Sequence, residues 1–525
     1  MRVYLCSILL FTQNCNICLI EKNYKDIYNI YVEKRDLEAI MKLNDILKGI
    51  ETVSVSGDMN VEISDIQYDS RKVEEGTMFI CIKGFVSDGH KYIKSAYEKG
   101  ARVFLVQDKV DDIEGCTFVQ VADTRKTMAE VAANFCEHPS EKFEVIGVTG
   151  TNGKTSITTF LNEILRSDNK KVGLIGTIKI FDGDNEVVSN STTPESVDLQ
   201  KIFKKMIKNR CDCCAMEVSS HSLELNRVDS TDFKIGIFTN LTPDHLDFHK
   251  TLENYRNAKE KLFHKTSEAN IINIDDCGGE VIYSHIKNLD TKCYTYGIEK
   301  EADFRATDIH SDASGVSYTL NGPGFEEKIF VPVPGMFTVY NTLAVIAACE
   351  VLGIERRVYV EGLKNTGGVS GRFETVPNDK GISVIVDYAH TPDALENVLN
   401  TAREFTKGNL ISVFGCGGDR DSEKRPLMGE IGQRLSDRCI ITNDNPRTEN
   451  PEKIIDDIKA GLDIERHNYE IIYDRREAIE KAIKNACKGD TVLIAGKGHE
   501  NYQIIGTVKH HFDDKETARE VIDSL

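Results

Sequence analysis

The stretch Gly147-Val148-Thr149-Gly150-Thr151-Asn152-Gly153-Lys154-Thr155 decides the fold of this chain. An apolar run before it, Phe143–Val148, predicts a buried strand, and apolar residues recur at helical spacing over Lys154–Arg166 behind it. A strand, a glycine-rich turn and a helix in this order direct backbone N–H groups and a helix N-terminus toward phosphate oxygens. We therefore predict a nucleotide site that binds ATP, with Lys154 on the β- and γ-phosphates and the Thr155 hydroxyl on Mg²⁺.

The glycines alone leave an ordinary tight turn as an alternative. Five residues separate Gly147 from Gly153, one more than in the common P-loop spacing. The Lys154-Thr155 pair that opens the following helix favours the phosphate site over the tight turn.

Length and composition limit the fold and the partners. At 525 residues the chain is too long for one core, and domains of ~100–200 residues suggest about three. The formal charge of −19 argues against a nucleic-acid partner and against stable contact with an anionic membrane. The 15 cysteines are scattered and odd in number, which is typical of reduced thiols, so we expect a cytoplasmic protein. Nothing in the sequence demands more than a monomer.

Residues 1–40 differ from the rest of the chain. The apolar run Val3–Ile20 is interrupted by polar residues between Thr12 and Asn16, and it is short for a membrane span. It is not followed by the small-residue cleavage site of a secretory signal. We expect an appended segment outside the core fold, in preference to a membrane anchor, with the folded protein beginning near Met41.

Strands and helices alternate along the remaining chain, which predicts α/β domains with parallel sheets. A break at His138-Pro139-Ser140 ends the first segment, and the glycine-marked joint Gly367–Arg372 introduces the third. The predicted strands are Met78–Ile82, Val103–Val106, Thr117–Val121, Val172–Ile175, Ala215–Val218, Ile235–Thr239, Asn270–Ile274, Ser383–Val386, Leu410–Phe414, Cys439–Thr442 and Thr491–Ala495. A helix is predicted over Asn341–Leu352. Ligands of such sheets bind at the carboxyl ends of the strands.

Polar residues gather where predicted strands of the second segment stop. Glu217 ends one strand, and His245 lies in the polar run Asn240–His249 after the next. A P-loop enzyme needs a carboxylate from a neighbouring strand for its Mg²⁺, and Glu217 is placed to supply it. A solvated loop carboxylate is the alternative for Glu217, and a hydrogen-bonded structural histidine is the alternative for His245.

Polar turns also follow strands of the third segment, at Asp387–Pro392, Gly415–Asp421 and Asp444–Glu449. The second of these is glycine-rich but lacks a Lys-Thr pair, so we expect a contact with substrate or adenine rather than a second phosphate site. Each turn alone is equally well explained by turn chemistry. Their shared position at strand ends favours a function.

These motifs resemble those of the Mur ligases, ATP-dependent enzymes that add amino acids to the peptidoglycan precursor. The resemblance runs in order from about Met41 to the C-terminus. It rests on Gly150–Thr155, Glu217–His221, Asn240–His249, Gly371–Glu374 and Asp387–Pro392. Three more motifs narrow it to the UDP-N-acetylmuramoyl-tripeptide synthetases: Asp69-Ser70-Arg71, Thr192-Thr193-Pro194 and Asp444-Asn445-Pro446-Arg447.

The resemblance implies the three-domain Mur ligase architecture. A UDP-substrate-binding domain is expected over residues 41–140, a central P-loop ATPase domain over 141–367, and a Rossmann-like, amino-acid-binding domain over 368–525. The resemblance also implies that ATP phosphorylates the D-Glu carboxylate of UDP-N-acetylmuramoyl-L-Ala-D-Glu. The incoming amine then attacks the acyl phosphate, and Lys154 and Mg²⁺ neutralise the spreading negative charge.

Roles for individual residues follow from the same resemblance. The catalytic residues are Lys154, Glu217, His245 and Lys259, and the Mg²⁺ ligands are Thr155, Glu217, His245 and a carbamate on Lys259. The ATP-binding residues are Gly150, Thr151, Asn152, Gly153, Lys154, Thr155, Ser156, Asn341, Arg372 and Asp387. The UDP-substrate residues are Ser70, Thr192, Thr193, Ser219 and Arg227, with backbone help from Gly84–Ser87. From its sequence position alone, Lys259 would be a solvated helix charge, and Leu225 stands where other members carry glutamine.

The choice of amino acid depends on Arg447. A guanidinium binds the distal carboxylate of meso-diaminopimelate through two charge-assisted hydrogen bonds. It repels the ammonium of lysine, because like charges about 4 Å apart cost on the order of 4 kcal/mol at an effective dielectric near 20. The resemblance implies diaminopimelate, held by Arg420, Asp444, Asn445, Pro446, Arg447, Gly496 and Glu500.

Other functions stay open at this point. The nearest are a lysine-adding member of the same family and a sister ligase, such as folylpolyglutamate synthase or the enzyme that adds D-Ala-D-Ala. A P-loop kinase or a switch GTPase would leave the third segment unexplained. A catalytically dead binding module would not need Lys154, Glu217 and Lys259 together.

Overall fold

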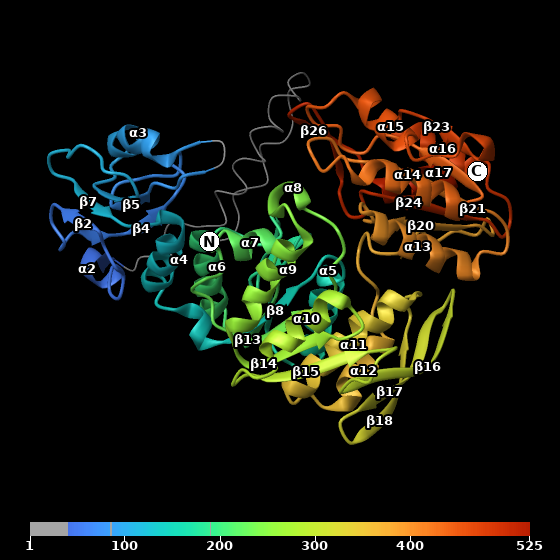
Figure 1. Cartoon of the computed structure of the whole chain (residues 1–525), viewed down its shortest axis with the longest axis horizontal. Coiled ribbons are helices and arrows are strands. Elements are labelled where there is room, and N and C mark those ends of the chain that lie inside the picture. Colours follow the sequence, from blue (N-terminus) through green and yellow to red (C-terminus); the bar gives the residue numbers. More distant parts are fainter. Residues whose placement is uncertain (1–39, 85–86, 190) are drawn as a thin grey trace, which may run out of the picture. The chain divides into compact units, whose positions relative to one another are not determined.

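The computed structural model describes residues 40–84, 87–189 and 191–525 (Figure 1). The expected extension over residues 1–40 therefore lies, up to residue 39, outside the described residues. The chain divides into two compact units, one ending at Thr124 and the other spanning Arg125–Leu525. Across the described residues, no helix is both long enough and apolar enough to cross a membrane.

The first unit is an α/β layer built on a mostly parallel sheet. Its strand order is β2-β7-β6-β5-β4, with β2 antiparallel to β7 and the other pairs parallel. These strands are β2 (Ser54–Ser56), β4 (Asp65–Gln67), β5 (Thr77–Ile80), β6 (Val103–Val106) and β7 (Thr117–Gln120). The helix α3 (Ile93–Glu98) packs on a core in which the rings of Phe104 and Phe118 stack 5.1 Å apart. The three strands predicted here are confirmed.

The second unit begins with α4 (Thr124–Phe135) and contains the sheet that carries the glycine-rich turn. Its parallel strands run in the order β9-β12-β8-β13-β14-β15-β16. Their bounds are β8 (Glu144–Thr149), β9 (Val172–Ile175), β12 (Cys213–Glu217), β13 (Phe233–Phe238), β14 (Thr266–Asn273), β15 (Lys292–Gly297) and β16 (Phe304–Asp312).

Helices cover both faces of this sheet, because the central strands are apolar on both sides (Figure 1). Successive residues of β8 point to opposite faces. Ile146 and Val148 pack toward α5 (Lys154–Ser167), α11 (Met336–Val351) and α12 (Arg356–Lys364). Val145 packs toward the core that contains residues of α6 (Ser196–Lys208) and α10 (Cys277–Ile286).

Antiparallel strands extend this parallel sheet at both edges. On one side β10 (Lys179–Phe181) and β11 (Glu186–Val188) form an antiparallel hairpin. On the other, β17 (Gly315–Gly322) and β18 (Phe325–Val331) continue β16 as an antiparallel meander. Buried and exposed residues alternate along β16 and β18, as suits strands with one face in solvent.

The third segment is a doubly wound sheet, as predicted. Its strand order is β19-β20-β24-β21-β22-β23, parallel except for β19. The bounds are β19 (Glu374–Thr375), β20 (Ser383–Asp387), β21 (Leu410–Phe414), β22 (Arg438–Ile441), β23 (Tyr469–Ile471) and β24 (Thr491–Ala495). One face packs on α13 (Pro392–Phe405), α14 (Lys424–Leu435) and α15 (Pro451–Lys459), and the other on α16 (Arg475–Lys484) and α17 (Asp514–Asp523). The polar turns at 387–392, 415–421 and 444–449 therefore lie at the carboxyl ends of β20, β21 and β22.

One predicted helix begins earlier than expected. α11 starts at Met336 rather than at Asn341, directly after Gly335, whose φ of 99° lies in a region that favours glycine. The β-branched and aromatic residues of its first turn hid the helical spacing from the sequence. As a result Asn341 is held on a regular helix and is buried beside the glycine-rich turn.

Candidate functional site

The glycine-rich turn between β8 and α5 depends on its glycines. Gly150 has a φ of +149° and Gly153 a φ of +90°. A Cβ on Gly150 would lie 1.7 Å from Oγ1 of Thr239, and one on Gly153 would lie 2.5 Å from Oδ1 of Asn341. Both positions therefore require glycine, because the side chains of Thr239 and Asn341 pack directly against the turn.

Hydrogen bonds from the loop after β13 fix this turn. Asn240 accepts from the backbone N–H of Thr151 at its carbonyl (2.9 Å) and from that of Asn152 at Oδ1 (2.8 Å). The Thr239 hydroxyl donates to the Asn152 carbonyl at 2.6 Å. The polar run that begins at Asn240 therefore holds the turn in shape.

Lys154 reaches back over the turn that precedes it. Its Nζ donates to the carbonyls of Gly150 and Thr151, both at 2.9 Å. Burial lowers the pKa of Lys154, while the nearby carboxylates of Glu217 and Asp244 oppose that shift. An ammonium bonded to neutral carbonyls gains from an anionic partner, because charge-assisted hydrogen bonds are the stronger ones.

Residues of the third segment meet the turn directly. A guanidinium nitrogen of Arg372 donates to Oγ1 of Thr155 at 3.2 Å, and Asn152 Nδ2 donates to Oδ2 of Asp393 at 3.0 Å. Arg372 also lies over the ring of Tyr388, 4.6 Å from its centroid. Predicted ATP residues that are far apart in the sequence are therefore brought together.

Asp387 is a bracing residue at the end of β20. Its carboxylate accepts from the backbone N–H groups of Phe373 (2.6 Å) and Ala389 (2.7 Å). Burial raises the pKa of Asp387, and the neighbouring Arg372 opposes this shift. The remaining predicted ATP residue, Ser156, occupies the first turn of α5.

Glu217 ends β12 beside the turn and is almost fully buried. Its two carboxylate oxygens accept from the backbone N–H and the hydroxyl of Thr177, at 2.8 and 3.0 Å. The Thr177 and Thr192 hydroxyls lie 3.0 Å apart, which joins Glu217 to the predicted substrate residues. The alternative of a solvated loop carboxylate is excluded by this burial.

The predicted substrate residues of the second unit form one network. The Thr193 hydroxyl donates to the Glu217 carbonyl (2.9 Å) and accepts from the backbone N–H of Ser219 (3.0 Å). Arg227 donates to the Thr193 carbonyl at 3.1 Å and pairs with Glu195 at 2.8 Å. Leu225 lies at the C-terminal end of α7 (Ser220–Glu224).

Ser70 lies in the first unit, in the turn after β4, where its carbonyl accepts from Lys99 Nζ at 2.9 Å. The flanking Asp69 and Arg71 form an ion pair of 2.7 Å. The predicted backbone contribution of Gly84–Ser87 includes Phe85 and Val86, which lie outside the described residues.

Lys259 lies on α9 (Leu252–Glu260) and is buried, so the interpretation of a solvated helix charge is wrong. Its Nζ lies 4.2 Å from the centroid of the Tyr255 ring. Burial, together with the neighbouring Lys154, holds the pKa of Lys259 well below its usual range. The neutral amine is the form that reacts with carbon dioxide.

His245 sits in an aromatic cluster close to Lys259. Its ring centroid is 4.8 Å from that of His221 and 6.2 Å from that of Tyr255, and Nε2 lies 3.4 Å from Oδ2 of Asp244. Burial lowers the pKa of His245, which keeps the imidazole neutral, as a metal ligand must be.

A separate cluster in the first unit contains residue types that bind metals, but its side chains hydrogen-bond within the protein. Ligand atoms of Asp88, His90 and Asp108 lie within 4.8 Å of one another. His90 Nδ1, however, lies 2.6 Å from Asp88 Oδ1, and its Nε2 accepts from the backbone N–H of Gln107 at 3.0 Å. Both ring nitrogens are used in protein hydrogen bonds, so this cluster stabilises a turn.

The predicted amino-acid pocket forms where two turns of the third segment meet. Arg447 donates to the carbonyl of Gly418 at 2.8 Å, and the backbone N–H of Gly418 donates to the Asn445 carbonyl at 2.9 Å. Burial and the charge of nearby Arg447 lower the pKa of Arg420. A Cβ on Gly417 would lie 2.9 Å from a guanidinium nitrogen of Arg447 and 3.9 Å from Cγ of Arg420, so both arginines border the same turn.

The other predicted pocket residues include two carboxylates, those of Asp444 and Glu500. Oδ2 of Asp444 is buried and has no hydrogen-bond partner among the described residues. A Cβ on Gly496, whose φ is +119°, would lie 2.7 Å from that oxygen. Asn445 Nδ2 donates to Oε2 of Glu500 at 2.8 Å. Pro446 contributes the carbonyl against which Gly418 packs.

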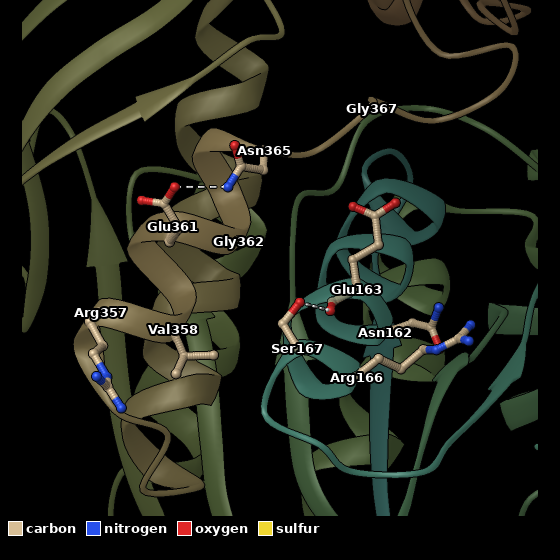
Figure 2. A pocket seen from close by; sticks show the side chains of 10 residues that line it. All are labelled: Asn162, Glu163, Arg166, Ser167, Arg357, Val358, Glu361, Gly362, Asn365 and Gly367. Carbon is tan, nitrogen blue, oxygen red and sulfur yellow. Dashed lines mark hydrogen bonds between the residues drawn. The ribbon is translucent and has the colours of Figure 1, made fainter.

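The cavity in Figure 2 lies elsewhere. It has a volume of about 810 Å³ between α5 and α12. Its lining residues are Asn162, Glu163, Arg166, Ser167, Arg357, Val358, Glu361, Gly362, Asn365 and Gly367, and these include no predicted site residue. Across this cavity, the Thr366 hydroxyl donates to Oε2 of Glu163 at 2.7 Å and so ties the glycine joint to α5.

Sequence reasoning missed two residues of the site. Thr177 follows β9 and orients Glu217, and Lys497 follows β24 and contacts Asn445. Both are polar residues just beyond a predicted strand, and Lys497 lies between Gly496 and Gly498. The rule that polar residues at strand ends carry function would have selected both.

Comparisons with known proteins agree with this geometry. A model of the Mur ligase middle domain matches residues 148–349, one of the Mur ligase glutamate ligase domain matches 371–498, and one of the Mur ligase family catalytic domain matches 62–136. A UDP-N-acetylmuramoyl-L-alanyl-D-glutamate–2,6-diaminopimelate ligase from Clostridioides difficile (strain 630) is 69% identical over 485 residues, covering 92% of this chain and 100% of that relative. The enzyme of the same name from Alkaliphilus metalliredigens (strain QYMF) is 50% identical, covering 92% of this chain and 97% of that relative.

Solved structures show the same fold. A UDP-N-acetylmuramoyl-L-alanyl-D-glutamate–2,6-diaminopimelate ligase superposes with a TM-score of 0.66 at 32% identity, covering 92% of this chain and 99% of that chain. MurF from Acinetobacter baumannii superposes with a TM-score of 0.65 at 16% identity, covering 93% of this chain and 100% of that one. The motifs, the three-domain architecture and these matches establish that the chain belongs to the Mur ligase family.

Proposed function

We propose that this chain is an ATP-dependent ligase that adds meso-diaminopimelate to the D-Glu carboxylate of UDP-N-acetylmuramoyl-L-Ala-D-Glu in peptidoglycan precursor synthesis. The observation that carries the proposal is that Arg420 and Arg447 both approach Gly417, while Oδ2 of Asp444, three residues before Arg447, has no hydrogen-bond partner among the described residues. An amino-acid centre carries one carboxylate and one ammonium, and this pocket offers a complement to both. The names of the 69% and 50% identical relatives support the same activity.

ATP is held by the glycine-rich turn and by the residues that reach it. The turn leads into the N-terminus of α5, whose backbone N–H groups favour phosphate, and Lys154 exchanges carbonyl partners for phosphate oxygens. Arg372 approaches from the third segment, beside the Thr155 hydroxyl. Asn341 packs against Gly153 of the turn, and Asp387 accepts a hydrogen bond from the backbone N–H of Phe373, the residue after Arg372.

A Mg²⁺ ion fits the donors that surround the turn. Thr155, Glu217, His245 and a carbamate on Lys259 would hold it, because a hydroxyl, a carboxylate, a neutral imidazole and a carbamate all donate through lone pairs. The lowered pKa of Lys259 favours the neutral amine from which a carbamate forms. When bound, the ion supplies positive charge between two anionic reactants, the γ-phosphate and the substrate carboxylate.

The chain's own residues then position the reaction. Thr192, Thr193, Ser219 and Arg227 bind the muramoyl-dipeptide and Ser70 binds the uridine end. Lys154 neutralises the charge that develops as the carboxylate takes the γ-phosphate to give an acyl phosphate. The amine of diaminopimelate attacks this acyl carbon, and phosphate leaves. No covalent nucleophile is required, so the cysteines have no catalytic role.

Domain boundaries, location and assembly belong to the same proposal. We assign residues 41–140 to the UDP substrate, 141–367 to ATP and 368–525 to the amino acid. The ranges matched by the three family models, 62–136, 148–349 and 371–498, fall inside these segments and support them. The enzyme works in the cytoplasm as a monomer, without nucleic acid and without stable membrane contact.

Phosphate release from ATP tests the proposal. The assay contains UDP-N-acetylmuramoyl-L-Ala-D-Glu and either meso-diaminopimelate, L-lysine or no amino acid. Release only with diaminopimelate is the expected result, and Lys154→Met abolishes it. Release with lysine alone would keep the family and reject the pocket assignment. Release without any amino acid would indicate a nucleotidase, and none with either amino acid would reject the ligase.

A further inference from the structure

Lys497 is a buried lysine at the amino-acid pocket for which the family motifs give no role. It follows β24 directly, and its side chain has no exposure to solvent. Its Nζ donates to Oδ1 of Asn445 at 3.2 Å and to Oε2 of Glu500 at 3.3 Å. Taking an ammonium out of water costs free energy that its partners must offset. The two acceptors, Asn445 Oδ1 and Glu500 Oε2, offset this cost.

The contacts of Lys497 set the direction of the Asn445 amide. Oδ1 of Asn445 accepts from Lys497 and also from the backbone N–H of Ile504, at 2.9 Å. The amide nitrogen on the other side donates to Glu500 Oε2 at 2.8 Å. A flipped amide would turn its NH₂ group toward two other donors, which is unfavourable. Lys497 thus selects one of two orientations for a residue of the pocket.

Lys497 also orients the carboxylate of Glu500. Oε2 of Glu500 accepts hydrogen bonds from Lys497 Nζ and from Asn445 Nδ2, while Oε1 lies 3.4 Å from the Tyr502 hydroxyl. One carboxylate of the pocket is therefore compensated within the protein. The other carboxylate, Asp444, keeps a buried Oδ2 that has no hydrogen-bond partner among the described residues.

We propose that Lys497 is a positioning residue that sets the amino-acid specificity of the pocket. It holds Asn445 and Glu500 so that the pocket accepts the distal centre of a diamino dicarboxylate, with its carboxylate on Arg420 and Arg447. It also removes the surplus negative charge that would attract the lone distal ammonium of lysine. This inference rests on the proposed ligase function.

The test compares the steady-state kinetics of Lys497→Met with those of the wild-type chain. The KM for meso-diaminopimelate rises about tenfold to hundredfold, as expected for the loss of hydrogen bonds to charged groups. The KM values for ATP and for the UDP substrate, and kcat at saturating amino acid, stay within about threefold. The ratio of kcat/KM for L-lysine to that for diaminopimelate increases.

Lys509→Met is the matched control. Lys509 is exposed on β26 (Val508–His511), and its Nζ lies 4.1 Å from the centroid of the Tyr502 ring. Lys497 faces the same ring at 5.6 Å. The same substitution beside the same ring leaves all three KM values at wild-type levels. Lys497→Arg keeps the charge and recovers part of the affinity for diaminopimelate.

A double variant separates positioning from folding. Lys497→Met alone leaves the Glu500 carboxylate without its ammonium partner, and Lys497→Met/Glu500→Gln also removes the charge of that carboxylate. Because Lys497 acts through Glu500 as well as Asn445, the rise in KM for diaminopimelate in the double variant is smaller than the product of the two single rises. Independent, additive losses would contradict the inference, and so would an unchanged KM in Lys497→Met. A wild-type chain without diaminopimelate-dependent phosphate release would instead overturn the proposed function.

Discussion

The guanidinium of Arg372 donates to the hydroxyl of Thr155, 3.2 Å away, although 217 positions separate the two residues. Thr155 opens the helix behind the glycine-rich turn, and Arg372 closes the glycine joint that leads into the third segment. The contact joins two residues that we assign to ATP, and they come from two parts of the second unit. The joint itself is held on one side by Thr366, which bonds to Glu163 of α5.

Replacing Arg372 tests its proposed place beside the phosphates. Arg372→Met should lower kcat/KM for ATP by about tenfold to hundredfold, because a charge-assisted hydrogen bond and its stacking on Tyr388 are lost. The KM for diaminopimelate should not change. Arg357→Met, at an exposed arginine on α12, is the control and should behave as wild type. An unchanged KM for ATP in Arg372→Met would remove this residue from the ATP site.

Replacing Arg447 tests the basis of amino-acid choice. Arg447→Met should raise the KM for meso-diaminopimelate about tenfold to hundredfold and should increase the relative rate with L-lysine. The reason is that the variant loses both the bond to the distal carboxylate and the repulsion of the lysine ammonium. Arg466→Met, at an exposed arginine of η4 (Ile464–Arg466), serves as control. Unaltered selectivity in Arg447→Met would place the distal carboxylate elsewhere.

The cavity beside the glycine joint gives a pH-dependent prediction. Burial raises the pKa of Glu163 above its usual 4.5, against the opposing hydrogen bond from Thr366. The folded chain therefore binds more protons than the unfolded chain between pH 4.5 and the folded pKa, and the free energy of unfolding falls as pH rises through that window. Glu163→Gln still accepts from Thr366 but carries no charge.

Chemical denaturation at several pH values measures how much the titration of Glu163 contributes to the free energy of unfolding. Glu163→Gln should be more stable than wild type at pH 7, and the difference should vanish below about pH 4. Glu361→Gln is the control, because Glu361 lines the same cavity but is exposed (Figure 2). A stability difference that is independent of pH would show that the effect does not come from the titration of Glu163.

A buried ion pair beneath the amino-acid pocket should matter for stability. Arg475 and Asp514 pair at 2.6 Å with no solvent exposure, and Arg475 also donates to the carbonyls of Asn443 and Ala495. Arg475→Met strands the Asp514 carboxylate and should cost about 3–5 kcal/mol of unfolding free energy. Arg475→Met/Asp514→Asn should recover much of this loss. A single variant as stable as wild type would contradict the account.

Much of the site was predictable because its signals are local. Glycines before a Lys-Thr pair, apolar runs of strand length and polar residues at strand ends are all visible within a few positions. These signals located β8, α5, Glu217 and the turns after β20, β21 and β22. The strand-end rule works because parallel strands deliver their carboxyl ends to one edge of the sheet.

The rest depended on distant contacts. Lys259 looks like a solvated helix charge until α9 packs against the turn and buries it. The bonds from Asn152 to Asp393 and from Arg372 to Thr155 join positions that no local pattern relates. The edge strands β10 and β11 were missed because three residues are too few to show a periodicity. Lys497 was passed over as one lysine in a glycine-rich turn.

A competition assay tests whether the chain selects meso-diaminopimelate over L-lysine. The wild-type chain is given ATP, UDP-N-acetylmuramoyl-L-Ala-D-Glu and equal concentrations of meso-diaminopimelate and L-lysine, and the products are separated by mass. We expect the diaminopimelate tripeptide almost alone, with a preference of about a thousandfold from the ~4 kcal/mol of charge repulsion. Equal amounts of both products, or a predominance of the lysine product, would contradict it.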